Sequence, residues 1–170
     1  MQKPIMNLNR LFFNLSAYVL LPLLISVAIF DIIGRKFGNV GSTKLQELQW
    51  HFFFGSVMLS IGCAYLFDSH VRVDVLRSRF SPKLLKWIEI IGCGLALFPL
   101  SALLIWGGGD QFWRAFVSGE RSAAAMGLGN RWIIMSVIPV GGVLLLLAGI
   151  YTVRKNIEEI RKLSIDAGSL

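Results

Sequence analysis

Long apolar runs separated by short charged segments dominate this sequence of 170 residues. Hydrophobic residues make up 55% of the chain and charged residues only 16%, against about 25% charged residues in an average soluble domain. A helix needs about 20 apolar residues to cross a bilayer, and a backbone exposed to lipid must satisfy its own hydrogen bonds. The sequence therefore predicts an all-α membrane protein with one four-helix domain over residues 1–170.

Four apolar runs are long enough to cross the bilayer. They cover residues 11–33, 45–67, 84–106, with a helical continuation to residue 116, and 132–153. The first run is longer than the apolar part of a cleaved signal peptide, and no small-residue cleavage site follows it. We therefore expect it to be retained as a span. Pro22 and Pro99 fall inside the first and third runs, where proline typically kinks a helix.

The basic residues are distributed unequally between the two predicted sides of the membrane. Four spans place both termini on one side, and that side carries 11 of the Lys and Arg residues against 6 on the other. Basic residues in short loops favour the cytoplasm, so both termini are predicted to be cytoplasmic. The cytoplasmic set comprises Lys3, Arg10, Arg72, Arg77, Arg79, Lys83, Lys86, Arg154, Lys155, Arg161 and Lys162. The outer set comprises Arg35, Lys36, Lys44, Arg114, Arg121 and Arg131.

The second loop has the pattern of a short amphipathic helix over residues 71–80. Apolar residues alternate there with basic ones at spacings that suit one helix face, as in helices that lie in the membrane interface. A solvated charged turn is the alternative. Ser81 then fits a helix N-cap and Pro82 the first helical position. The residues predicted to anchor this region at the lipid headgroups are Arg72, Arg77, Arg79, Lys83, Lys86 and Trp87.

Few residues offer chemistry. Ionisable groups inside membrane spans are functional candidates by default, but Asp31, Glu47 and Asp110 all lie close to a span end. We expect Asp31 and Glu47 to form interfacial ion pairs with Arg35, Lys36 or Lys44. Glu89 is the deepest candidate, and His51 shares a helix face with Glu47.

The main cofactor and catalytic alternatives fit poorly. Haem binding needs two axial ligands at one depth, whereas His51 and His70 fall near opposite membrane faces. Cys63 and Cys93 form no CxxC pair, and are expected to be small buried hydrophobic residues. No phosphate-binding loop, zinc spacing or nucleophile elbow occurs. We therefore expect no enzyme activity, no cofactor, no metal and no nucleic-acid partner for this chain.

One segment resembles a known family. Residues 45–76 combine Glu47 and Trp50 at the start of a glycine-containing apolar run with His70, Arg72 and Asp74 at its end. This pattern is similar to the small membrane subunit, or Q subunit, of tripartite ATP-independent periplasmic (TRAP) transporters. The segments 118–122 (SGERS) and 131–142 are also similar to that family, and the hydropathy matches over the whole chain.

The resemblance implies a location in the bacterial inner membrane and two partners. These are a large twelve-span permease that carries the sodium and substrate sites, and a periplasmic protein that captures an organic acid. Membrane phospholipids are the third expected partner, because of the basic residues of the second loop. The small subunit is expected to extend the fixed scaffold of the permease and to share the docking face of the binding protein. The alternative is an independent small transporter or channel. The candidate docking residues are Arg35, Lys36, Arg114, Glu120 and Arg121.

Overall fold

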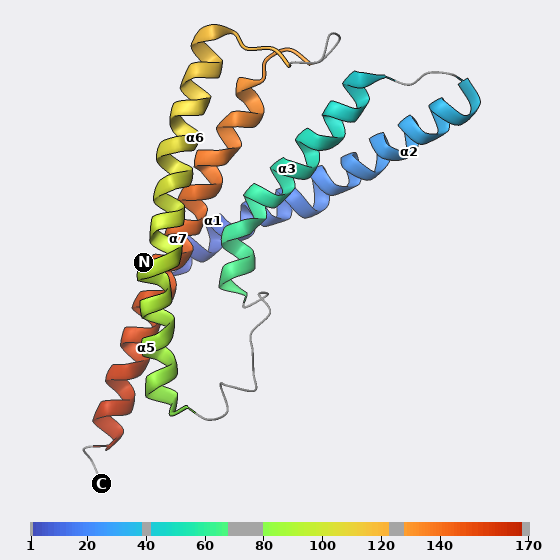
Figure 1. Cartoon of the computed structure of the whole chain (residues 1–170). Coiled ribbons are helices and arrows are strands. Elements are labelled where there is room, and N and C mark those ends of the chain that lie inside the picture. Colours follow the sequence, from blue (N-terminus) through green and yellow to red (C-terminus); the bar gives the residue numbers. More distant parts are fainter. Residues whose placement is uncertain (1, 39–41, 68–79, 123–127, 168–170) are drawn as a thin grey trace.

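The computed structural model describes residues 2–38, 42–67, 80–122 and 128–167 (Figure 1). All regular structure in these ranges is helical, which confirms the predicted all-α class. The elements are α1 (Gln2–Leu15), π-helix η1 (Ser16–Leu20), α2 (Leu21–Gly38), α3 (Thr43–Leu66), α5 (Pro82–Gly92), π-helix η2 (Cys93–Leu97), α6 (Phe98–Ser118) and α7 (Trp132–Ala167). The predicted interfacial helix at 71–80 falls almost entirely outside the described residues.

Within the described ranges, three helices are long and apolar enough to cross a membrane. They span Lys3–Gly38, Lys83–Ser118 and Trp132–Ile165, and each extends beyond the apolar run that predicted it. The extensions are polar, so hydropathy alone does not mark them. Helix α3 has 24 residues, which is also long enough to span. Its Gln46, Gln49 and His51 lower its hydropathy, so the fourth span stays a prediction.

Two of the three long helices in the described ranges contain a π-helical turn just before a central proline. Segment η1 ends two residues before Pro22, and η2 ends two residues before Pro99. Proline lacks an N–H and clashes with the carbonyl four residues earlier, and a π-helical turn relieves that clash. The backbone N–H of the residue before each proline bonds five residues back, to Ser16 in the first helix and to Cys93 in the second. The predicted kinks at both prolines therefore take the form of π-helical turns.

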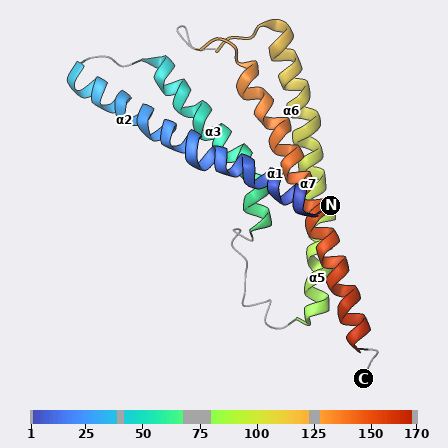
Figure 2. The same ribbon diagram turned by 180° about the vertical axis from the view of Figure 1, so that it is seen from behind.

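The helices form two diverging pairs (Figures 1 and 2). Helices α6 and α7 run side by side along their length, while the continuous rod of α1, η1 and α2 crosses them obliquely with α3 alongside it. We call the end with the α2–α3 and α6–α7 connections the outer end, after the predicted orientation. The C-terminus lies at the opposite end.

Glycines on α3 and α7 let the two pairs meet where they cross. A Cβ added to Gly62 of α3 would lie 2.7 Å from the backbone oxygen of Leu144, and one added to Gly141 of α7 would lie 2.8 Å from that of Met58. Leu144 is 1% exposed. Membrane helices associate through such close backbone packing rather than through the hydrophobic effect, because lipid tails are as apolar as the side chains. The crossing of α3 and α7 is therefore the packed centre of the chain.

Both cysteines lie near this centre. Cys63 and Cys93 are free thiols and each is 1% exposed, which confirms their prediction as small buried residues. The thiol of Cys93 lies 3.0 Å from the hydroxyl of Tyr65.

Candidate functional site

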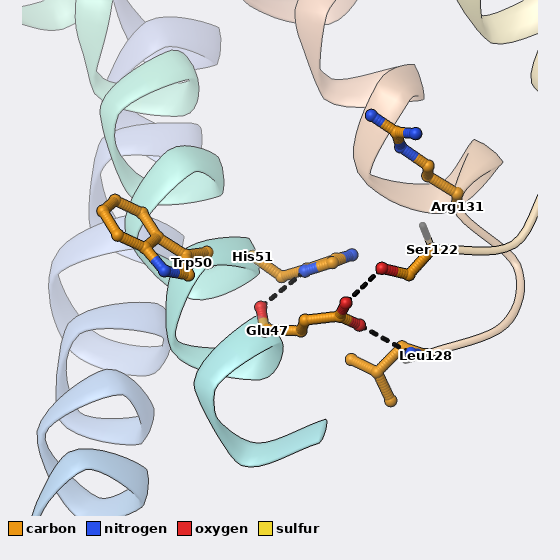
Figure 3. Close-up of a pocket in the computed structure, with 6 residues that line it drawn as sticks. All are labelled: Glu47, Trp50, His51, Ser122, Leu128 and Arg131. Carbon is orange, nitrogen blue, oxygen red and sulfur yellow. Dashed lines mark hydrogen bonds between the residues drawn. The ribbon is translucent and has the colours of Figure 1, made fainter. Parts of the chain in front are cut away.

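The most organised polar contact of the outer end joins α3 to the loop that connects α6 and α7. Glu47, in the second turn of α3, points its carboxylate at this loop (Figure 3). One carboxylate oxygen accepts a hydrogen bond from the hydroxyl of Ser122, and the other accepts one from the backbone N–H of Leu128 at 2.6 Å. The Glu47 side chain therefore fastens both ends of the loop to α3. We call this set of three residues the Glu47 clasp.

The loop has its own internal support around the clasp. The backbone N–H of Ser122 bonds the carbonyl of Leu128 at 3.2 Å, and that of Arg131 bonds the carbonyl of Glu120 at the same distance. The Arg131 guanidinium also pairs with the Glu120 carboxylate at 2.6 Å. These bonds hold the two ends of the loop together, so Glu47 binds a loop that is already closed by its own contacts.

Helix α6 enters this loop through a Schellman motif. Gly119 has φ +60°, and Glu120 donates its backbone N–H to the carbonyl of Ala115 at 3.0 Å. Glycine adopts this left-handed conformation without the penalty that a Cβ brings, so it commonly ends helices in this way. On the other side of the loop, Phe116 and Trp132 pack edge to face with ring centroids 5.5 Å apart. The turn at Gly119 thereby sets the direction in which the chain leaves α6, and the contact between the two rings sets the spacing of α6 and α7 beside the loop.

A small pocket opens beside the clasp. Its volume is about 230 Å³, and its lining comprises Glu47, Trp50, His51, Ser122, Leu128 and Arg131 (Figure 3). Ligand sites usually measure about 300–1,000 Å³, so the pocket is small for a substrate. Nδ1 of His51 lies 2.6 Å from the backbone oxygen of Glu47, one turn earlier. Both carboxylate oxygens of Glu47 already accept hydrogen bonds, so the geometry suits fastening rather than proton transfer.

The described residues contain no group of three or more His, Cys, Asp or Glu side chains that could hold a metal ion. The ionisable residues expected at the span ends take separate places instead. Asp31 pairs with Arg35 at 2.7 Å, as expected, and Asp110 pairs with Arg114 at 2.7 Å. Glu47 joins the loop instead of the expected lysines or arginine.

The candidate docking residues fall into two groups. Arg35 and Lys36 lie near the end of α2, whereas Arg114, Glu120 and Arg121 lie at the end of α6 and in the loop after it. Figure 1 shows the ends of α2 and α6 as two separate tips. The structure therefore does not gather all five side chains into one cluster.

The residues predicted to anchor the opposite end are only partly described. Arg72, Arg77 and Arg79 lie outside the described residues, as do the family-motif residues His70 and Asp74. Lys83, Lys86 and Trp87 belong to α5, which begins at the predicted position. There the hydroxyl of Ser81 accepts a hydrogen bond from the N–H of Leu84 at 3.4 Å. Lys86 pairs with Glu159 of α7 at 2.5 Å, which the sequence did not suggest.

Comparison with curated proteins finds no match to this chain. A family model described as "Tripartite ATP-independent periplasmic transporters, DctQ component" matches residues 24–159. The matched range includes the Glu47 clasp, all of α3, α5 and α6, and most of α7. It covers well over half of the chain and agrees with the resemblance carried by Glu47 and Trp50. The chain therefore belongs to the DctQ family, the small membrane component of tripartite ATP-independent periplasmic transporters.

Proposed function

We propose that this chain is the fixed membrane scaffold of a sodium-coupled transporter that takes up an organic acid. It binds a large permease subunit of twelve spans, holds it in the bilayer while the permease moves, and shares the docking of a periplasmic substrate-binding protein. Sodium and substrate bind in the large subunit. Packing faces and membrane anchors, rather than catalytic groups, carry this role.

The exposed rod of the first long helix is the observation that carries the proposal. Only 6% of its most apolar stretch is buried within the chain, against 33% for α7. On α2 the only buried residue is Asp31, and the face opposite it is apolar and exposed. A membrane helix with so few contacts in its own chain has its packing surface available for another subunit. We call this surface the free face of α2, and it comprises Ile29, Phe30, Ile33 and Phe37.

The Glu47 clasp supports the docking part of the proposal. It ties the loop after α6 to α3, and Glu120 and Arg121 directly precede the fastened Ser122. The nearby side chain of Arg114 is 70% exposed. A docking surface of this kind gives specificity and speeds association through complementary charge, with modest affinity per contact.

Photo-crosslinking of the assembled transporter tests the scaffold proposal. A photo-reactive amino acid at Ile33, on the free face of α2, is expected to crosslink to the large permease in the native membrane. The matched control is Leu103 of α6, which is 70% exposed and equally apolar. A crosslink from Leu103 with none from Ile33 would move the contact to α6. Solute flux through liposomes that contain this chain alone would overturn the scaffold role altogether.

Uptake assays test the docking proposal separately. Arg114→Glu and Arg121→Glu together are expected to raise the concentration of binding protein needed for half-maximal uptake, while the yield of the membrane complex stays unchanged. Arg161→Glu and Lys162→Glu together, on the predicted cytoplasmic tail, make the same charge change away from the outer end. An unchanged requirement for binding protein in the double variant would contradict the docking role.

Headgroup anchoring by the basic residues near α5 is the third part of the proposal. Each basic residue near an anionic surface contributes about 1 kcal/mol of attraction. Gln in place of Arg72, Arg77, Arg79, Lys83 and Lys86 is therefore expected to lower the yield of the complex in native lipid. Full yield and full uptake from that variant would exclude anchoring by these side chains.

A further inference from the structure

A second, larger groove lies between α2 and α3 at the outer end. Its volume is about 670 Å³, and its lining comprises Leu24, Asp31, Ile32, Arg35, Gln46, Gln49, Trp50 and Phe53. Arg35 and Gln46 lie nearest the connection between the two helices, and Leu24 and Phe53 lie farthest from it. Leu24 and Arg35 are 11 residues apart, or about 17 Å along the helix axis. The groove is therefore polar at its outer end and apolar at its deeper end.

A buried carboxylate organises the polar end. Asp31 is 5% exposed, and its Oδ2 accepts hydrogen bonds from Arg35 at 2.7 Å and from Gln49 at 3.3 Å. Its Oδ1 has no hydrogen-bond partner among the described residues. A buried carboxylate with an unsatisfied oxygen costs free energy and calls for a role outside stability. Holding the Arg35 guanidinium at the mouth of the groove is a role that this geometry serves.

Arg35 is oriented but not enclosed. The amide oxygen of Gln46, in the orientation that satisfies both ends of that amide, accepts from Nη1 of Arg35 at 3.1 Å. The Arg35 side chain is nevertheless 45% exposed, so part of its five-donor guanidinium remains available. Lys44 lies at the same end of the two helices and is exposed, while the carboxylate of Glu47 is turned to the clasp on the other side. The mouth of the groove therefore carries net positive charge.

We propose that this groove binds one glycerophospholipid of the outer leaflet. The lipid phosphate lies at Arg35, which supplies charge-assisted hydrogen bonds, and one acyl chain lies along Leu24, Ile32 and Phe53. Trp50, which is 69% exposed, marks the level of the interface, where tryptophan is enriched in membrane proteins. The match of a cationic mouth to an apolar floor over this length favours a lipid over a soluble anion, which would leave the floor uncovered.

Native mass spectrometry of the full chain, purified in mild detergent, tests the site without any transporter partner. The probes are dioleoyl phosphatidylglycerol, phosphatidylethanolamine and phosphatidylcholine, each added at rising concentration. Arg35→Gln is expected to weaken binding of each lipid by about tenfold, the effect of one lost charge-assisted bond to the phosphate that all three carry. Lys36→Gln removes the neighbouring charge, whose ammonium lies over the Phe37 ring instead of in the groove, and is expected to keep the wild-type affinity.

A second variant separates the groove from its charge. Leu24→Trp fills the apolar floor while leaving Arg35 in place, and is expected to lower binding of all three lipids. Helix content measured by circular dichroism confirms that each variant is folded. Equal binding by wild type and Arg35→Gln, or equal losses in Arg35→Gln and Lys36→Gln, would overturn the proposal. So would displacement of the lipid by inorganic phosphate, or its absence from the complex with the large permease, which would make the groove a protein contact.

Discussion

The two helix pairs of this protein are held together in different ways. Helices α6 and α7 pack through glycines: a Cβ added to Gly108 would lie 2.9 Å from the Cβ of Ile138, and one added to Gly142 would lie 2.9 Å from the Cβ of Leu104. Close packing of the rod on α3 is confined to α1, where Gly62 faces Asn9, whereas η1 and α2 meet α3 with more room. A Cβ added to Gly55, on the α3 face toward the rod, would reach only ordinary contact with Leu20, at 3.4 Å.

Hydrogen bonds replace close packing where η1 and α2 run beside α3. The hydroxyl of Ser16 donates to the backbone oxygen of Ser56 at 3.0 Å, and the hydroxyl of Ser60 donates to that of Ser16 at 2.9 Å. Gln49 reaches Asp31 nearer the outer end. Both devices are known in membranes, where apolar side chains gain little by leaving lipid. Glycine packing therefore closes the gap between α6 and α7, whereas the separated hydrogen bonds leave a groove between α2 and α3.

The glycine triplet of α6, which comprises Gly107, Gly108 and Gly109, provides the largest test of whether glycine packing closes the α6–α7 pair. Gly108→Leu forces a side chain into Ile138 and Pro139 of α7, whereas Gly107 has open space around its Cβ position. Overpacking costs about 1–3 kcal/mol, and both variants gain the same helix propensity over glycine. We expect Gly108→Leu to be about 2–3 kcal/mol less stable than Gly107→Leu in unfolding by SDS titration.

Gly109→Leu is the matched check on the other side of the triplet, since its Cβ position is also open. It is expected to behave like Gly107→Leu. Similar stability for all three variants would mean that α6 and α7 are not closed by glycine packing, and the contrast between the two pairs would be lost.

The Glu47 clasp joins α3 to the α6–α7 loop, so its removal is expected to loosen the link between the two pairs at the outer end. Glu47→Ala leaves the Ser122 hydroxyl and the Leu128 N–H without their shared acceptor. We expect amide exchange at Leu128 to become about tenfold faster, because its hydrogen bond then opens locally. Helix amides in α6 and α7 are expected to keep their protection.

Glu120→Gln is the control for this measurement, because it removes the ion pair with Arg131 inside the loop and leaves the clasp intact. Its effect on exchange at Leu128 is expected to be small. Unchanged exchange in Glu47→Ala would show that the loop keeps its position without α3.

Sequence patterns were sufficient for features that depend on neighbours along the chain. The helix start at Ser81, the pair of Asp31 with Arg35 four residues later, and the disturbance before Pro22 and Pro99 all follow from local chemistry. The polar start of the first helix at Gln2 was missed because apolar runs mark the membrane-crossing part of a helix and not its whole length.

The partners of Glu47 could not be predicted for a different reason. Its two donors lie 75 and 81 residues away, and one of them is a backbone N–H that any residue could supply. The same holds for the glycine triplet, where the sequence does not say which of three adjacent glycines faces α7. The predicted interfacial helix and its basic residues stay predictions, because they lie outside the described residues.

The hydrogen bonds of Ser16 with Ser56 and Ser60 form a serine bridge, and removing it tests how the rod is held to α3. Ser16→Ala removes a hydroxyl that is 1% exposed and bonded to two serines of α3. Interhelical hydrogen bonds in membranes contribute about 0.6 kcal/mol on average, so a loss of about 1 kcal/mol is expected in the same SDS titration. Ser26→Ala is the control, since the Ser26 hydroxyl donates to the Pro22 carbonyl of its own helix. An equal loss in both variants would remove the bridge as a link between η1 and α3.

The ion pair between Lys86 of α5 and Glu159 of α7 is expected to contribute least to the closed pair. It lies on the part of α7 toward the C-terminus, beside α5, and its two side chains are 26% and 36% exposed. Partly exposed ion pairs typically contribute about 0.2–1 kcal/mol, so Lys86→Glu is expected to cost about 0.5 kcal/mol. The doubly exchanged chain, with Lys86→Glu and Glu159→Lys, restores opposite charges and is expected to regain that stability. If Lys86→Glu instead cost as much as Gly108→Leu, charge rather than glycine packing would close this pair, and the contrast with the α2–α3 side would have to be redrawn.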